Sequence, residues 1–374
     1  MRRMTVALCC VACWPAVGLG ETEVLQLEDI SVVGASHRLE SARQVPGSVL
    51  AVDGERLGEA GLDDLGALAQ RVPGLMLSAP NPRYTAIGIR GLGSSSANDG
   101  LDGSVAVYLD GVYLGRQGMI PQDFVDIDRL EILRGPQATL YGKNATAGAI
   151  NLSSRMPSFV NEGQGEVRMG EDGLRHYRAS LSGPLVDEVL AARLSVYDLS
   201  RDGDIDNRFN GRQLDEQDRQ GLRGQLLWAP NERFSARLIG EYAVQDESAV
   251  LTASHLSATT HQRAAFVGYQ PLPVAPFARR VEQNDGNSLH TVQRGLTLQL
   301  DQHLDNELTL TSITGYRDWD YDSRYDADSM ALSVARSAVG LDHRQFSQEL
   351  RLAQSLGERF DYLLGVHYLQ QRLQ

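Results

Sequence analysis

The stretch DRLEILRGPQATLYGKNATAGAINL, residues 128–152, decides the interpretation of this chain. Its glycines and its Gly-Lys pair suggest a phosphate-binding loop, whose pattern is G-x-x-x-x-G-K-[ST]. The pattern fails, because Gln137 stands where a glycine is required and Asn144 stands where serine or threonine is required. We therefore interpret the glycines as turn residues of a compact chain, and Lys143 as a member of one such turn.

The residues around this stretch predict a small mixed α/β domain over residues 46–157. Asp53 is placed to cap a short helix over residues 54–60. The apolar residues between Leu62 and Val72 follow helical spacing until Pro73-Gly74 ends it. Two extended runs flank Asp110-Gly111, which is typical of a type I′ hairpin.

From residue 158 onward the helical spacing disappears and apolar residues alternate with polar ones. Phe360, Tyr362 and Leu364 share one face of such a segment, for example, and we count about nine segments of this kind. Short polar turns alternate with longer connections, of which the longest runs from about residue 246 to residue 288. This pattern is typical of an antiparallel transmembrane β-barrel, and a soluble β-sandwich is the alternative.

The N-terminus has the features of a secretory signal peptide over residues 1–20. Arg2 and Arg3 precede an apolar run that ends at small residues. A membrane anchor and a lipoprotein signal ending at Cys13 are the alternatives. All three cysteines lie in this segment, so the remainder has no disulfide and no thiolate metal ligand.

The charge and the motifs exclude several functional classes. The formal charge of −13 argues against a nucleic-acid partner, which normally meets a basic patch. Enzyme motifs such as G-x-S-x-G and H-E-x-x-H are absent from the sequence, so we expect no enzyme, no catalytic residue and no cofactor. His255 and His261 lie in the longest connection, where we expect them to be solvated rather than to bind a metal.

Residues 21–45 are polar and contain one short apolar patch, LEDISVVGA at residues 27–35. A disordered linker is one interpretation. The other is a strand that waits for the sheet edge of a partner.

The motifs of the chain resemble those of TonB-dependent outer-membrane receptors, in the order of that family. LEDISVVGA resembles the TonB box. QVPGSVLAVDGERL, LAQRVPGLML, IGIRGLGS, SVAVYLDGVYLGR and the opening stretch resemble successive segments of the plug domain, whereas SGPLVDEVLAARLSVY and FSQELRLAQ resemble early barrel strands. The resemblance implies an α/β plug over residues 46–157 and a barrel from residue 158, in the outer membrane of a Gram-negative bacterium.

Barrels of this family have 22 strands, and residues 158–374 do not suffice for that number. Each spanning strand takes about 9–11 residues, so 22 strands need on the order of 220 residues before any loop. We therefore expect an incomplete barrel of about nine strands in a truncated chain.

The resemblance also implies three groups of functional residues. The periplasmic protein TonB is expected to bind the box formed by Glu28, Asp29, Ile30, Ser31, Val32, Val33 and Gly34. Plug arginines are expected to be buried against barrel glutamates, with Arg90, Arg134, Glu131 and Glu349 as the candidates. For the ligand, an anionic chelate, we expect contacts from Arg83, Tyr84, Tyr113, Arg116 and Gln117 in apical turns.

Three functions follow from this resemblance. The first is import of a ferric siderophore or a similar iron complex, driven by TonB. The second is import of a different substrate, such as a carbohydrate fragment or a corrinoid, by the same class of receptor. The third is a surface receptor or adhesin that transports nothing. Outer-membrane lipid surrounds the protein in each case, and the sequence does not identify the substrate.

Overall fold

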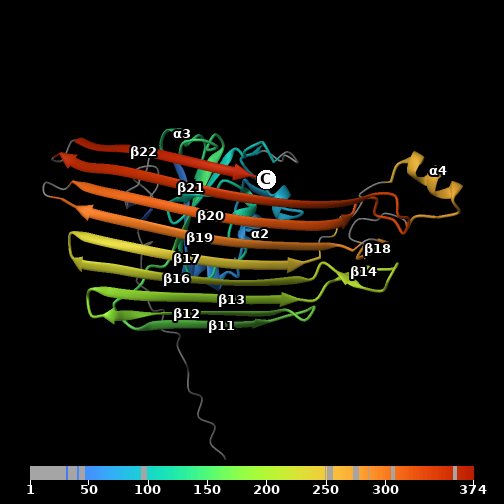
Figure 1. Ribbon diagram of the computed structural model, residues 1–374, viewed down its shortest axis with the longest axis horizontal. Helices are drawn as coiled ribbons and strands as arrows, with labels where there is room; N and C mark the ends of the chain where they lie inside the picture. Colours follow the sequence, from blue (N-terminus) through green and yellow to red (C-terminus); the bar gives the residue numbers. More distant parts are fainter. Residues whose placement is uncertain are drawn as a thin grey trace, which may run out of the picture.

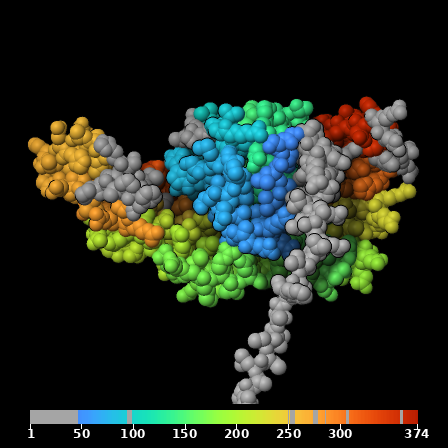
Figure 2. All heavy atoms as spheres, turned by 180° about the vertical axis from the view of Figure 1, so that it is seen from behind, coloured from blue at the N-terminus to red at the C-terminus, as the bar shows by residue number. Residues whose placement is uncertain are grey.

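The structure is a computed structural model that describes residues 31–32, 40–41, 47–93, 99–248, 250, 256–272, 278–284, 286–304, 308–356 and 360–374. A mixed α/β domain, the plug, packs against one face of a long antiparallel sheet, here called the barrel sheet (Figures 1 and 2). No helix within these ranges is both long and apolar enough to cross a membrane.

The plug contains two short helices whose N-termini are capped by aspartates. Helix α1 (Gly54–Glu59) begins after Asp53, whose carboxylate accepts a 2.8 Å hydrogen bond from the backbone N–H of Arg56. Helix α2 (Leu65–Arg71) begins after Asp64, which accepts a 2.8 Å bond from Ala67 in the same way. Each carboxylate satisfies a backbone donor that the first turn leaves free. The two helices predicted from the sequence are confirmed.

The main plug sheet has five strands in the order β3-β9-β10-β7-β8. Strand β10 lies parallel to β7, and the other pairs are antiparallel. Between β7 and β8 the φ angles are 49° at Asp110 and 76° at Gly111, so the predicted type I′ hairpin is confirmed. The strands are β3 (Ser48–Asp53), β7 (Val105–Leu109), β8 (Val112–Tyr113), β9 (Ile127–Arg134) and β10 (Gly148–Ser154).

Smaller elements complete the plug. Three short strands form a second antiparallel sheet in the order β4-β5-β6. These strands and the remaining helical turns are β4 (Leu75–Ser78), β5 (Ala86–Ile89), β6 (Leu92–Gly93), η1 (Pro82–Tyr84), η2 (Gln117–Met119) and α3 (Ala138–Tyr141).

The barrel sheet has nine antiparallel strands, which agrees with the number counted in the sequence. It is open in the described part of the chain, with β11 and β22 as its edges (Figure 1). In order, its strands are β11 (Glu162–Met169), β12 (Arg175–Val186), β13 (Leu190–Arg201), β16 (Gln217–Asn231), β17 (Phe234–Glu247), β19 (Ser288–His303), β20 (Thr309–Asp326), β21 (Arg336–Leu356) and β22 (Phe360–Leu373).

Short turns join these strands at one end of the sheet, and longer connections lie at the other end (Figure 1). The connection between β17 and β19 carries helix α4 (Ala258–Phe266) and strand β18 (Arg280–Val281). Strand β18 joins a three-stranded sheet with β14 (Ile205–Asn207) and β15 (Gln213–Leu214) from the connection between β13 and β16.

The two faces of the barrel sheet have the inverse polarity of a soluble protein. On β13, Arg193 and Ser195 point toward the plug and are buried, whereas Leu194 and Val196 point away and are exposed. Leucines on the neighbouring strands are exposed on the same outer face, among them Leu226, Leu238, Leu296 and Leu298. A polar inner face and an apolar outer face are what a membrane-spanning barrel requires.

Aromatic side chains border this apolar outer face. Near the short turns, the rings of Trp228 and Phe234 pack with their centroids 5.5 Å apart. Toward the long connections, Tyr242, Tyr316 and Phe346 are exposed on the outer face. Phe234 and Tyr242 are eight residues apart on β17, which is roughly 27 Å along a strand. This span matches the ~25 Å apolar band between the aromatic girdles of outer-membrane barrels.

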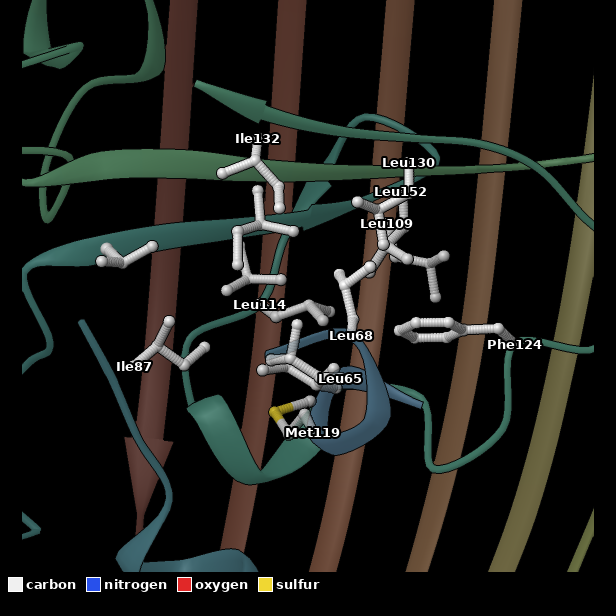
Figure 3. Packing of buried hydrophobic residues seen from close by; sticks show 14 of the residues in the cluster. Leu65, Leu68, Ile87, Leu109, Leu114, Met119, Phe124, Leu130, Ile132 and Leu152 are labelled. Atoms are coloured by element: carbon white, nitrogen blue, oxygen red, sulfur yellow. The ribbon is translucent and has the colours of Figure 1, made fainter. Parts of the chain in front are cut away.

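The hydrophobic core lies between α2, the plug sheets and the inner face of the barrel sheet. Figure 3 shows Leu65 and Leu68 of α2 facing Leu130 and Leu152 of the plug sheet, with strands of the barrel sheet crossing behind them. The barrel sheet contributes Trp319 of β20, which is only 2 % exposed, to the same cluster.

We predict that replacing Leu68, which is fully buried, with alanine lowers the free energy of unfolding by about 2–5 kcal/mol, because a cavity remains in a packed core. Denaturant titration in detergent, followed by Trp319 fluorescence in a Trp228→Phe background, measures the change. Leu92→Ala, at an exposed position of β6, is the control and should change the stability little. Equal effects of the two substitutions would contradict this core assignment.

Candidate functional site

The glycine stretch forms turns, as the sequence indicated. Gly142 has a φ of 64° and ends α3, and Asn144 has a φ of 66°. A Cβ at Gly148 would lie 2.3 Å from the carbonyl oxygen of Leu133, so only glycine allows β9 and β10 to approach there. Lys143 donates a 3.1 Å hydrogen bond to Asp102, which gives this lysine a carboxylate partner within the plug.

Only part of the expected TonB box lies within the described residues. Ser31–Val32 form strand β1, which pairs with β2 (Glu40–Ser41) in an antiparallel register. The backbone of these two residues therefore has a partner that the sequence did not suggest. The other five residues, Glu28, Asp29, Ile30, Val33 and Gly34, lie outside the described part of the chain.

The structure corrects the expected environment of the plug arginines. Arg90 is exposed, because the chain turns there with φ angles of 56° at Arg90 and 78° at Gly91. Arg134 is half-buried at the end of β9, immediately before Gly135 reverses the chain. Within the described ranges, neither guanidinium lies within 4.0 Å of a carboxylate.

The two glutamates expected to pair with these arginines have local partners instead. Glu131 is buried and lies 3.4 Å from the guanidinium of Arg129 on the same strand. Glu349 pairs at 2.5 Å with Arg351 of its own strand, β21. Residues two apart in a strand share a face, so each glutamate meets a cation without crossing between the plug and the barrel sheet. Glu349 also borders a cavity of about 470 Å³ that Lys143 lines.

Ion pairs do cross between the plug and the barrel sheet, but with the opposite polarity. The carboxylates belong to the plug and the arginines belong to the barrel sheet. In the clearest pair, Asp126 accepts hydrogen bonds of 2.5 and 2.6 Å from the guanidinium of Arg193 on β13, and the hydroxyl of Ser195 also donates to it. Both charged side chains are almost completely buried. Burial raises the pKa of Asp126, but the bonds from Arg193 and Ser195 outweigh it and hold the pKa below its usual value.

A second contact joins the plug to β12. Asp123 accepts a 2.8 Å bond from Arg178 and lies 2.7 Å from Nε2 of His176. Arg178 also reaches Asp63, just before α2, at 2.8 Å. One arginine of the barrel sheet thus holds two segments of the plug, which are 60 residues apart in the sequence.

The hairpin residue Asp110 forms a third contact. Its carboxylate accepts 2.9 Å bonds from the backbone N–H and the hydroxyl of Ser154, at the end of β10. Arg237 of β17 donates a 2.7 Å bond to that hydroxyl and lies 3.5 Å from Asp110. The sequence placed Asp110 in a turn, but the second role of its carboxylate depends on a strand more than 120 residues away.

Four of the five expected ligand residues line one cavity of about 60 Å³ between the plug and β20–β21, here called the apical cavity. They are Arg83, Tyr113, Arg116 and Gln117; Tyr84, the fifth, does not line it. Trp319 closes the cavity from β20, in the half of that strand nearer the long connection.

Most charges at the apical cavity are paired. Arg83 donates to Asp99 at 2.7 Å and to the hydroxyl of Tyr84 at 2.8 Å. Tyr113 is buried, and its hydroxyl accepts a 2.7 Å bond from Asn144. Burial raises the pKa of Tyr113 to about 12, so this phenol stays neutral at physiological pH. Gln345 of β21 fixes the neighbouring backbone, accepting from Gly115 N–H at 2.9 Å and donating to the Tyr113 carbonyl at 2.5 Å.

His261, one of the two histidines considered in the sequence, lies in α4, and His255 is outside the described residues. Within the described ranges, no three His, Cys, Asp or Glu side chains are grouped so that they could hold a metal ion.

We predict that Asp126→Asn and Arg193→Gln each lower the free energy of unfolding by about 3–5 kcal/mol. Asp126→Asn leaves the buried Arg193 with only the exposed Glu162, 2.5 Å away, as a counter-charge, and Arg193→Gln removes the arginine that pairs with the buried Asp126. The double variant should lose less than the sum of the two, with a coupling of about 0.5–3 kcal/mol. The same fluorescence titration measures all four proteins. Strict additivity would show that the two side chains do not interact.

The depressed pKa of Asp126 also predicts a dependence on pH. A carboxyl group whose pKa is lower in the folded protein stabilises the fold above the pKa of the unfolded chain. This stabilisation is lost as the pH falls through the lower, folded pKa. We therefore expect the difference in stability between the unsubstituted protein and Asp126→Asn to shrink as the pH falls below about 4. A difference that stays constant down to pH 2 would contradict the ionised pair.

Comparisons with known proteins agree with this architecture. Residues 41–149 match the family model of the TonB-dependent receptor plug domain. The pesticin receptor of Yersinia pestis is 34 % identical over 201 residues, which cover 53 % of this chain and 29 % of the relative. The ferrioxamine B receptor of Salmonella typhimurium is 30 % identical over 160 residues, which cover 41 % and 22 %. The matched regions span less than a third of the length of these relatives.

Solved structures share the fold. The ferric yersiniabactin uptake receptor of Yersinia pestis superposes with a TM-score of 0.75 at 22 % identity, over 91 % of this chain and 50 % of that one. The ferripyoverdine receptor of Pseudomonas aeruginosa gives a TM-score of 0.72 at 16 % identity, over 91 % and 44 %. Residues 41–149 therefore form a plug domain of the TonB-dependent receptor type, and this domain packs on the polar face of a membrane-type sheet.

Proposed function

We propose that the protein imports a ferric siderophore, or a similar iron chelate, across the outer membrane in a process driven by TonB. The observation that supports this proposal best is the plug domain, which is packed on the inner face of the barrel sheet with an apical cavity at their junction. The names of the relatives and structural neighbours agree, since they include receptors for ferrioxamine, ferric yersiniabactin and ferripyoverdine.

The contacts of the plug suit a domain that must be retained and then released. Ion pairs such as Asp126–Arg193 hold it in one orientation, because a buried charge without its partner costs several kcal/mol. Unlike an apolar core, such pairs exchange their partners for water once water enters. In the proposed function, TonB adds its own strand to the segment Glu28–Gly34 and draws on the plug.

A protein ligand is a second candidate. One relative is named a pesticin receptor, and one structural neighbour with a TM-score of 0.70 is described in complex with pyocin S2. In this chain, α4 projects from the long-connection end of the barrel sheet, and Phe266 at its end is 92 % exposed (Figure 1). Val267 beside it is 62 % exposed, so two adjacent apolar side chains are available there to a protein ligand.

Uptake of radiolabelled ferric chelates by cells that produce the receptor tests the proposed import. We expect Ile30→Pro to abolish uptake and to prevent capture of the receptor by purified TonB, because proline removes an N–H from the added strand. Chelate binding at the cell surface should remain. Ser36→Pro, after the box in the same tail, is the control and should keep both activities. Undiminished capture by TonB of the Ile30→Pro variant would refute the box, and uptake without TonB would refute the import mechanism.

A further inference from the structure

The apical cavity contains buried nitrogen donors that the fold leaves without a partner. Nε of Arg116 and Nε1 of Trp319 are both buried, both side chains line the cavity, and neither atom has a hydrogen-bond acceptor within the described residues. His343 of β21 is the register neighbour of Trp319, and both of its ring nitrogens are also buried without a partner. A buried donor without an acceptor is unfavourable, so three such side chains in one place point to a group that is bound there.

The charge balance at the cavity favours an anion. Asp99 is bonded to Arg83, and Asp102 is bonded to Lys143. Arg116 is the cation that remains, since no carboxylate lies within 4.0 Å of its guanidinium in the described part of the chain. The two N–H groups and this positive charge match the oxygen of a carboxylate or a catecholate, which accepts hydrogen bonds and donates none when ionised.

The size of the cavity limits what enters it. Its volume of about 60 Å³ holds a few water molecules or one carboxylate-sized group. A whole chelate needs a pocket of about 300–1,000 Å³. Only glycine fits at position 118 in the wall of this cavity, because a Cβ there would lie 2.4 Å from the carbonyl oxygen of Pro82 and 3.0 Å from the ring of Trp319.

We infer that Arg116 and Trp319 form a subsite for one anionic oxygen group of the imported chelate, with His343 beside them, so that the receptor selects ferric carboxylates or catecholates over neutral ferric hydroxamates. This inference rests on the proposed import of an iron chelate and specifies the class of that chelate. The body of the chelate lies above the cavity, and one arm reaches into it.

Equilibrium binding of radiolabelled ferric citrate, a ferric tricatecholate and a neutral ferric trihydroxamate to outer membranes that contain the receptor tests the subsite. We expect at least one of the two anionic chelates to bind at least about tenfold more tightly than the neutral one. Arg116→Gln should weaken that anionic chelate by at least about tenfold, and Trp319→Phe, which keeps the ring, by about threefold to tenfold. Both variants should change binding of the neutral chelate by less than about twofold.

Two matched controls accompany these variants. Arg90→Gln removes an exposed arginine of the plug, and Trp228→Phe alters a tryptophan on the outer face of the barrel sheet. Neither should change the binding of any chelate. Equal loss of all chelates in Arg116→Gln and Trp319→Phe would mean that the two residues only support the fold. Unchanged affinities would mean that the cavity holds water alone, and either result overturns the subsite. If no chelate binds to the unsubstituted receptor, the proposed import itself is refuted.

Discussion

The buried arginines of the barrel sheet need counter-charges, and the rest of the structure depends on this requirement. A sheet that turns leucines toward lipid must turn its polar residues inward, where water is largely excluded once the plug is in place. Arg193, Arg178 and Arg237 then lose their hydration, and an unpaired cation in such a position is expensive. The aspartates of the plug meet this demand, so the position of the plug follows from the polarity of the sheet.

The same requirement explains why the plug carries carboxylates in its turns. Asp110 and Asp126 both have positive φ angles, 49° and 56°, in short connections that face the sheet. Aspartate tolerates this backbone region better than most residues, and its short side chain keeps the carboxylate close to the turn. A single residue type therefore shapes the connection and neutralises an arginine opposite. Apolar contacts complete the interface nearer β20, where Trp319 packs into the plug core.

Local patterns in the sequence were sufficient to predict the main helices, the hairpin and the strands of the barrel sheet. Asp53 before α1, the Asp110-Gly111 turn and the alternation from residue 158 each act over a few residues, and the structure contains the elements that they predict. The pairing between the plug and the barrel sheet was not predictable in this way. Arg193 stands in the polar phase of an alternating segment, which shows that it faces inward, but nothing nearby identifies Asp126 as its partner. Arg134 has apolar neighbours that suggested burial, yet its place at the end of β9 leaves it half-buried, with no carboxylate partner among the residues that the structure describes. Trp319 and His343 lie side by side because of the register of β20 and β21, and no local pattern in the sequence sets this register.

Strand β3 has a mechanical consequence. It lies at the edge of the five-stranded plug sheet, where β9 is its one neighbour among the described strands, and it is the first strand of that sheet in the chain. Tension on the residues before Ser48 therefore acts on one end of an edge strand. If it is directed away from β9, it breaks the bonds from Ser48↔Arg134 to Asp53↔Arg129 one after another. Peeling of this kind needs less force than shearing all the bonds at once. The pairing of β3 with β9 is thus the part of the plug sheet that such tension loads first. The Asp126 and Asp110 contacts hold the side of the domain that lies against the barrel sheet.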